Sequence, residues 1–269
     1  MLIISERYGR LGNNIYQLLN IIYEALQQKD NINLKLLYYL SPTINIQNIE
    51  TQINDLFPNK NQITRHHFMP KDLHLINKRK VDIQRFFDIS KKFIYPNIKK
   101  MEPLNERICL IHLRSGDIFN EGGGHSSYIQ PPLAYYKKII QDFDKEYDKF
   151  IIVTEPDGRN PCTRLLKEFS NKVIVTTNHI LNDYSLLLRT QSIILSRSSF
   201  SDTSVFLNPY IKKVFFWDYN HCFCDKSILP KNIKVTSFIH TKPYIKEWRR
   251  TPEQLNLMIH YKMEDISMV

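Results

Sequence analysis

The sequence predicts an α/β protein whose second half forms a parallel, doubly wound sheet. From residue 107 onward, short apolar runs of strand length alternate with amphipathic stretches of helix length. This rhythm is typical of consecutive βαβ units. The 269 residues allow two modest α/β domains with adequate cores. We therefore expect an N-terminal lobe over residues 1–104, a Rossmann-like lobe over residues 105–240 and a C-terminal helical segment over residues 241–269.

The expected N-terminal lobe begins with a short apolar strand at residues 2–4 and continues into an amphipathic helix from Ile15. Prolines punctuate an irregular stretch over residues 41–79. Residues 96–103 hold two prolines and are expected to cross to the second lobe.

In the second lobe, the apolar runs predict strands at residues 108–113, 150–154, 173–176, 192–195 and 214–217. The intervening patterns predict helices at residues 133–143, 162–169, 183–188 and 203–207. A last helix is expected over residues 251–262. Thr251 suits its N-cap, Pro252 its first position and Glu253 its first turn.

The most informative segment is His-Leu-Arg-Ser-Gly-Asp at residues 112–117, which ends the first strand of the second lobe. Successive side chains of a strand alternate between its faces, so His112 and Arg114 project the same way. Ligands bind at the carboxyl ends of strands in open α/β sheets. A guanidinium there suits a phosphate or pyrophosphate. The alternative is a buried His and Arg that only brace the loop.

Two further segments place anion-binding chemistry after a strand. Gly-Arg-Leu-Gly-Asn-Asn at residues 9–14 joins the first strand to the first helix, where glycine allows close approach and free N–H groups attract anions. Ser198, Ser199 and Ser201 open a helix after the strand at residues 192–195. The alternative reading is an ordinary turn in the first case and helix caps in the second.

These motifs occur in the order found in the GDP-fucose-dependent fucosyltransferase superfamily. The chain resembles the α-1,2-fucosyltransferase family most, with the α-1,6- and protein O-fucosyltransferases as more distant relatives. The resemblance runs from residue 9 to about residue 208. It departs in two places: Ser115 stands where that family usually has a second Arg, and Asp202-Thr203 stands where it usually has aromatic residues.

The resemblance implies a GT-B-type architecture of two Rossmann-like lobes, with the C-terminal helix returning to the N-terminal lobe. It also implies an inverting transfer of fucose from GDP-fucose to a hydroxyl of a glycan acceptor. In such a transfer, negative charge grows on the leaving pyrophosphate. We expect Arg114, helped by His112, to neutralise that charge. The expected donor-binding residues are Arg10, Gly12, Asn13, Asp183, Ser198, Ser199 and Phe200, with Asp183 at the nucleoside.

We expect no metal and no cofactor. Asp142-Phe143-Asp144 matches the Asp-x-Asp pattern of metal-dependent transferases, but it lies at the charged end of a predicted helix. The general base is left open among Asp117, Glu121 and His125. Glu121 and His125 flank Gly122-Gly123-Gly124. This segment is interpreted either as a flexible loop that closes over the acceptor or as a disordered surface loop, with equal weight.

The formal net charge of +10 and the sequence pI of about 9.3 favour anionic partners. A sugar nucleotide, a membrane surface and nucleic acid all qualify. The Lys and Arg residues are scattered, so we expect a solvated basic surface and no nucleic acid. Two alternatives remain: a transferase for another GDP-hexose, and a non-catalytic basic protein that binds nucleic acid or glycan on a transferase fold.

Cysteine usage and hydropathy suggest a reducing, cytoplasmic setting. Cys109, Cys162, Cys222 and Cys224 are expected to be free thiols, because Cys-Phe-Cys has the wrong spacing for a zinc site and no second pair. A first strand at Leu2 leaves no room for a signal peptide, and no apolar run approaches the ~20 residues of a membrane span. Peripheral contact with a membrane surface stays open.

Overall fold

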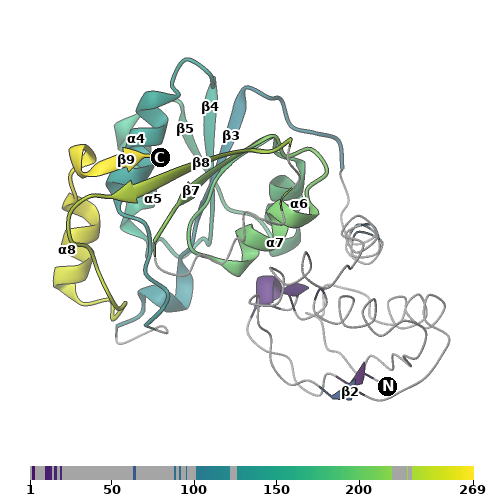
Figure 1. Ribbon diagram of the computed structural model, residues 1–269, viewed down its shortest axis with the longest axis horizontal. Coiled ribbons are helices and arrows are strands. Elements are labelled where there is room, and N and C mark those ends of the chain that lie inside the picture. Colours follow the sequence, from purple (N-terminus) through teal and green to yellow (C-terminus); the bar gives the residue numbers. More distant parts are fainter. Residues whose placement is uncertain are drawn as a thin grey trace. The chain divides into compact units, whose positions relative to one another are not determined.

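The computed structural model of the chain is shown in Figure 1. It describes residues 101–121, 126–219, 229 and 232–269, together with isolated positions among the first hundred. Two compact units divide the chain: Met1–Lys99 with Asp225–Leu229, and Lys100–Cys224 with Pro230–Val269. In the first unit, strand β1 (Leu2–Ile3) pairs in parallel with β2 (Ile63–Thr64). Most other elements expected for the N-terminal lobe lie outside the described residues.

The second unit is built on a seven-stranded sheet with the order β5-β4-β3-β6-β7-β8-β9. The strands are β3 (Ile108–Leu113), β4 (Lys149–Thr154), β5 (Val173–Thr176), β6 (Ser192–Ile194), β7 (Lys213–Trp217), β8 (Lys234–His240) and β9 (Ile266–Met268). All neighbours are parallel except β8 and β9, which are antiparallel. Counted along the chain, the six parallel strands follow the Rossmann order 3-2-1-4-5-6. The expected parallel, doubly wound sheet is confirmed.

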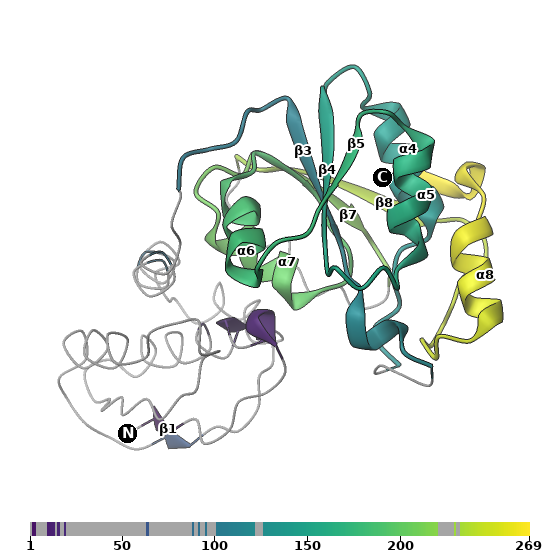
Figure 2. The same ribbon diagram turned by 180° about the vertical axis from the view of Figure 1, so that it is seen from behind.

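Helices cover both faces of this sheet, as Figures 1 and 2 show. One layer holds α4 (Leu133–Asp142), α5 (Pro161–Phe169) and α8 (Pro252–His260), with α4 packed against both others. The opposite layer holds α6 (Ile180–Arg189) packed against α7 (Ser199–Leu207). The helix expected from residue 183 begins earlier, at Ile180, while α7 begins at Ser199, within the serine run that was expected to open it.

The central strands β3 and β4 are buried on both faces, and their continuous apolar runs are typical of parallel strands between two helical layers. Cys109 and Cys162 lie in the core as free thiols. Cys222 and Cys224 lie outside the described residues.

The C-terminal segment packs on the second unit. Trp248 is fully buried, its ring packs edge-on against Phe119, and its Nε1 donates to the carbonyl of Ile118 at 2.6 Å. Thr251 caps α8 as expected by accepting a hydrogen bond from the Gln254 N–H. Helix α8 ends at His260, and the chain continues into the edge strand β9, which the sequence patterns did not indicate. The expected return of this segment to the N-terminal lobe concerns a contact between the two units and stays a prediction.

Candidate functional site

The order in which the chain adds strands to the sheet reverses between β3 and β6, and we call this place the switch point. The chain runs from β3 to β4 and β5 on one side and then crosses to β6 on the other side of β3. The connections leave these two strands in opposite directions, so a crevice is expected at their carboxyl ends, where ligands bind in this type of sheet. Two buried side chains meet at this point: the Nδ1 of His112 on β3 lies 2.8 Å from the Oγ of Ser196, just after β6.

His112 is uncharged in this setting. Burial, and secondly the positive charge of Arg114, lower the pKa of its imidazole to about 3. The ring lies beside Phe200, with ring centroids 5.5 Å apart. The help expected from His112 is therefore limited to hydrogen bonding and positioning, since a neutral imidazole brings no positive charge to a leaving group.

Arg114 follows directly after β3 and keeps hydrogen-bonding capacity for an anion. Its Nη2 donates to the Oδ1 of Asp117 at 2.7 Å, and its side chain is 15% exposed where that of Asp117 is 58% exposed. The buried Nε of Arg114 donates to no group in the described part of the chain. A partly buried guanidinium with a free donor is suited to an incoming phosphate oxygen.

The backbone around Arg114 is held by the loop between β4 and α5. The Nδ2 of Asn160 donates to the carbonyl of Arg114 at 2.8 Å, and the backbone N–H of Asn160 donates to the Oγ of Ser115 at 3.1 Å. That hydroxyl in turn donates to the Oδ1 of Asp157 at 2.6 Å. Ser115, which replaces the usual second Arg of the resembled family, thus ties two loops together here.

The turn after Arg114 is held in part by the side chain of Asp117, one of the candidates for the general base. Gly116 adopts a positive φ of 76°, which glycine tolerates without strain, and opens a short 3-10 helix over Gly116–Phe119. The Oδ1 of Asp117 accepts from the backbone N–H of Ile118 at 3.1 Å as well as from Arg114. These contacts give Asp117 a structural part in the turn. Glu121 is exposed, and His125 lies outside the described residues.

The start of α7 lies beside the switch point. The Oγ of Ser198 caps the helix by accepting from the Phe200 N–H at 3.3 Å, and the Phe200 ring packs between His112 and Tyr184. The expected cluster of Ser198, Ser199 and Phe200 is therefore adjacent to His112.

Asp183 lies in the first turn of α6, one residue before Tyr184. Both of its carboxylate oxygens accept from Asn178, one from the side-chain Nδ2 at 2.8 Å and one from the backbone N–H at 3.4 Å. Burial raises the pKa of Asp183, and the bonds from Asn178 act in the opposite direction. Its expected contact with a nucleoside stays a prediction.

Arg10, Gly12 and Asn13 belong to the first unit. Gly12 is buried there, while Arg10 and Asn13 are half-buried. Their expected cooperation with Arg114 in holding one ligand involves both units and stays a prediction.

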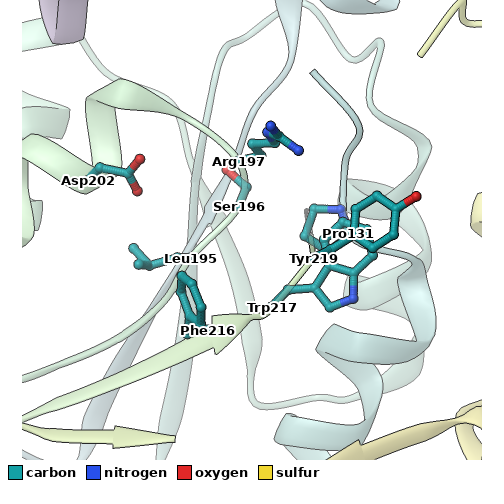
Figure 3. A pocket seen from close by; sticks show the side chains of 8 residues that line it. All are labelled: Pro131, Leu195, Ser196, Arg197, Asp202, Phe216, Trp217 and Tyr219. Carbon is teal, nitrogen blue, oxygen red and sulfur yellow. The ribbon is translucent and has the colours of Figure 1, made fainter. Parts of the chain in front are cut away.

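A pocket opens at the carboxyl ends of β6 and β7, next to the switch point (Figure 3). The pocket is small, with room for about one water molecule. Its lining residues are Pro131, Leu195, Ser196, Arg197, Asp202, Phe216, Trp217 and Tyr219.

Asp202, Trp217 and Tyr219 are not among the residues that the motifs indicate. The only signal for Asp202 was its departure from the aromatic residue usual in the resembled family. Trp217 ends an apolar strand and looks like core from the sequence alone. The pocket brings these residues to one edge of the sheet with Ser196, and so with His112.

The two carboxylates of the Asp-x-Asp pattern have nearby cationic partners. Asp142 pairs with Lys138 within α4, with Nζ and Oδ2 3.3 Å apart. Asp144 pairs with Lys172, with Nζ and Oδ1 3.0 Å apart. Within the described ranges, no three His, Cys, Asp or Glu side chains gather closely enough to hold a metal ion.

No protein-family model matches the chain, and no curated protein matches its sequence. Among solved structures, the chain is similar to the Escherichia coli heptosyltransferase WaaC with ADP, at 10% identity and a TM-score of 0.44, over 88% of this chain and 92% of that one. It is also similar to a family 9 glycosyltransferase from Veillonella parvula, at 12% identity and a TM-score of 0.36, over 87% of this chain and 69% of that one. The function below is therefore argued from the residues of this chain. No helix in the described part of the chain is both long and apolar enough to cross a membrane.

Proposed function

We propose that the chain is a glycosyltransferase that binds a nucleoside-diphosphate sugar at the switch point of its second unit. The observation that carries this proposal is the placement of Arg114. A partly buried guanidinium, with a donor that no described group uses, stands at the carboxyl end of β3, where the connections from β3 and β6 leave in opposite directions. Sheets of this order bind nucleotides at that point.

The chemistry of the neighbouring groups supports a pyrophosphate as the ligand. Glycosyl transfer from a sugar nucleotide expels a pyrophosphate, on which negative charge grows as the glycosidic bond breaks. The fixed cation of Arg114 stabilises that charge, and the N–H groups at the start of α7 favour an anion at the same edge. His112 links the end of β3 to both, because it is hydrogen-bonded to Ser196 after β6 and packs against Phe200 at the start of α7.

The Arg114 loop is preorganised for this task. Asn160 and Ser115 hold its backbone through three hydrogen bonds of 2.6 to 3.1 Å that also involve Asp157. A charge that is fixed before the reaction needs no reorganisation when the bond breaks, and this is the main source of electrostatic catalysis.

For the donor we propose GDP-fucose and for the reaction an inverting, metal-independent transfer to a glycan hydroxyl. The support is the sequence resemblance to the α-1,2-fucosyltransferases. A transferase for another GDP-hexose would keep the same phosphate-directed residues and is the second candidate.

The test is thermal stabilisation of the purified chain by GDP, UDP, ADP and a short DNA duplex at moderate salt. A ligand at 100 times its dissociation constant adds roughly 2.7 kcal/mol to the free energy of unfolding. We expect GDP to raise the unfolding temperature clearly and DNA to leave it unchanged. An activity assay should then show release of GDP from GDP-fucose. A salt-sensitive shift with DNA and none with any nucleotide would replace the transferase with a basic binding protein. A shift with ADP or UDP alone would keep the reaction class and change the donor.

A further inference from the structure

A second guanidinium lies on the loop next to Arg114. Arg159 belongs to the loop between β4 and α5, and the Nδ2 of its neighbour Asn160 donates to the carbonyl of Arg114 at 2.8 Å. The side chain of Arg159 is 49% exposed, whereas that of Arg114 is 15% exposed. A ligand that arrives from solvent can therefore reach the guanidinium of Arg159 directly.

The guanidinium of Arg159 is held against the turn that follows Arg114. Its Nη1 donates to the Oδ1 of Asn120, the residue after the short helix Gly116–Phe119. The backbone N–H of Asn120 donates to the carbonyl of Asp117 at 3.1 Å, and the side chain of Asp117 accepts from Arg114. The two guanidinium groups thus hold the two ends of the same turn.

Asp157 anchors the loop that carries Arg159. Its Oδ1 accepts from the Ser115 hydroxyl at 2.6 Å and from the backbone N–H of Arg159 at 3.1 Å. Burial acts to raise the pKa of Asp157, but these bonds and one from the backbone N–H of Gly116 hold the pKa below its ordinary value. Its Oδ2 lies 3.8 Å from the Nε of Arg159, which is too far for a hydrogen bond. In the described part of the chain, Nη1 is thus the only guanidinium nitrogen of Arg159 that donates a hydrogen bond, and the others remain for an anion.

The strand order places Arg159 along the path of the proposed donor. The carboxyl ends of the strands follow one another as β5, β4, β3 and β6. The pyrophosphate is proposed at the ends of β3 and β6, and Asp183, the expected contact of the nucleoside, follows β5 in the first turn of α6. A donor that reaches both places must pass the end of β4, where the loop with Arg159 begins.

We propose that Arg159 is a second phosphate-binding residue of the donor site and holds the pyrophosphate together with Arg114. This inference rests on the proposed function and adds a residue from a neighbouring loop to its site. A pyrophosphate carries negative charge on both of its phosphates, and the planar fork of one guanidinium matches the oxygens of one phosphate. Arg159, on the nucleoside side of Arg114, gives the other phosphate a cationic partner.

The experiment measures the dissociation constant of GDP, or of ADP or UDP if the chain binds one of these instead, at low and at moderate salt. Arg159→Met keeps the aliphatic stem and removes the charge, so the affinity should fall about tenfold at low salt. Arg159→Lys keeps the charge without the planar fork, so its affinity should lie in between. Because salt screens charges at an exposed group, the difference between the wild type and Arg159→Met should shrink at moderate salt.

Arg164→Met is the matched control. The guanidinium of Arg164 is 73% exposed on α5 and pairs with Glu168 one helical turn further along. The same substitution there removes one positive charge from a nearby stretch of the chain and touches none of the Arg114 loop. We expect this variant to bind the nucleotide as the wild type does.

The possible results separate this inference from the proposed function. A wild type that binds none of the nucleotides overturns both. Normal nucleotide binding by Arg159→Met overturns the role of Arg159 and leaves the transferase standing. A loss that salt does not reduce, that Arg159→Lys does not lessen or that Arg164→Met shares also overturns the inference, because it is not the loss of a charge contact at this position. If Arg159→Met does not fold, Arg159→Lys decides, and wild-type affinity in that variant overturns the inference.

Discussion

The imidazole of His112 and the hydroxyl of Ser196 lie 2.8 Å apart, although the two residues are 84 positions apart in the sequence. Their hydrogen bond joins the carboxyl ends of β3 and β6, the two strands that flank the switch point. It connects the half of the sheet that carries Arg114 with the half that carries the start of α7. The two proposed anion-binding elements are thereby held at a fixed separation.

Burial of neutral His112 makes stability depend on pH. The pKa of its imidazole is about 3 in the folded chain and ~6.5 in the unfolded one. The unfolded state therefore binds an extra proton between these values, and stability falls as the pH drops through this window. We expect the wild type to lose about 2 kcal/mol relative to His112→Gln between pH 7 and pH 5. Urea unfolding of both proteins at the two pH values measures this, and a constant difference would contradict a buried neutral ring.

Arg114→Ala should remove the proposed charge stabilisation without unfolding the chain, because its described ion-pair partner Asp117 is largely exposed. We expect GDP affinity to fall about tenfold or more and the transfer rate to fall on the order of 10²–10³. Arg164→Ala is the matched control, since that guanidinium is 73% exposed on α5 and pairs only with Glu168 among the described groups. Equal GDP binding by Arg114→Ala and the wild type would overturn the assignment of the site.

Asn160 is expected to position Arg114 as well as to cap α5. Its Oδ1 accepts from the Cys162 N–H at 2.9 Å while its Nδ2 holds the Arg114 carbonyl. Asn160→Ala should lower the free energy of unfolding by about 2 kcal/mol, from a lost cap and an unsatisfied carbonyl. It should also weaken GDP binding severalfold.

Thr251→Ala provides the comparison, because it removes a helix cap on α8 and touches none of the Arg114 loop. This variant should lose about 1 kcal/mol of stability and bind GDP normally. Parallel losses of GDP binding in both variants would mean that Asn160 acts only through overall stability.

Transfer activity should persist in EDTA. The carboxylates of Asp142 and Asp144 have lysine partners at the end of α4, and the proposed charge stabilisation comes from Arg114. The double variant Asp142→Asn, Asp144→Asn should accordingly retain its rate. Activity that EDTA abolishes and Mn²⁺ restores would sink the metal-free mechanism.

The sequence predicts the central part of the fold well and its edge less well. Strands β3, β4, β6 and β7 are found within one residue of the expected ranges, because buried parallel strands read as continuous apolar runs. Strand β8 was not expected, since Lys234, Thr236 and Ser237 interrupt its apolar pattern next to the sheet edge. The short strand β9 is held by pairing with β8, and a pairing partner is not visible in local sequence.

The residues of the candidate site also differ in how far the sequence could indicate them. His112 and Arg114 were indicated because a motif at the end of a recognisable strand has a defined direction. The bond from His112 to Ser196 depends on which strands become neighbours, and that information is tertiary. The sequence did not indicate Asp202 as a pocket residue, because an acidic residue in the first turn of a helix is normally explained by its interaction with the helix dipole.

Replacing Asp202 by an apolar residue should stabilise the chain in the absence of ligand. Its carboxyl group is buried and its Oδ2 has no hydrogen-bond partner in the part of the chain that the structure describes, so Asp202→Leu should add about 1–3 kcal/mol at pH 7. Burial raises the pKa of this group in the folded state, so the unfolded state loses its proton first as the pH rises from about 4. The wild type then becomes progressively less stable than the variant, and the gain should be larger at pH 7 than at pH 4. Thermal unfolding of both proteins at the two pH values measures the trend, which is opposite in sign to that of His112. A variant less stable than the wild type at both pH values would contradict a buried carboxyl oxygen without a partner.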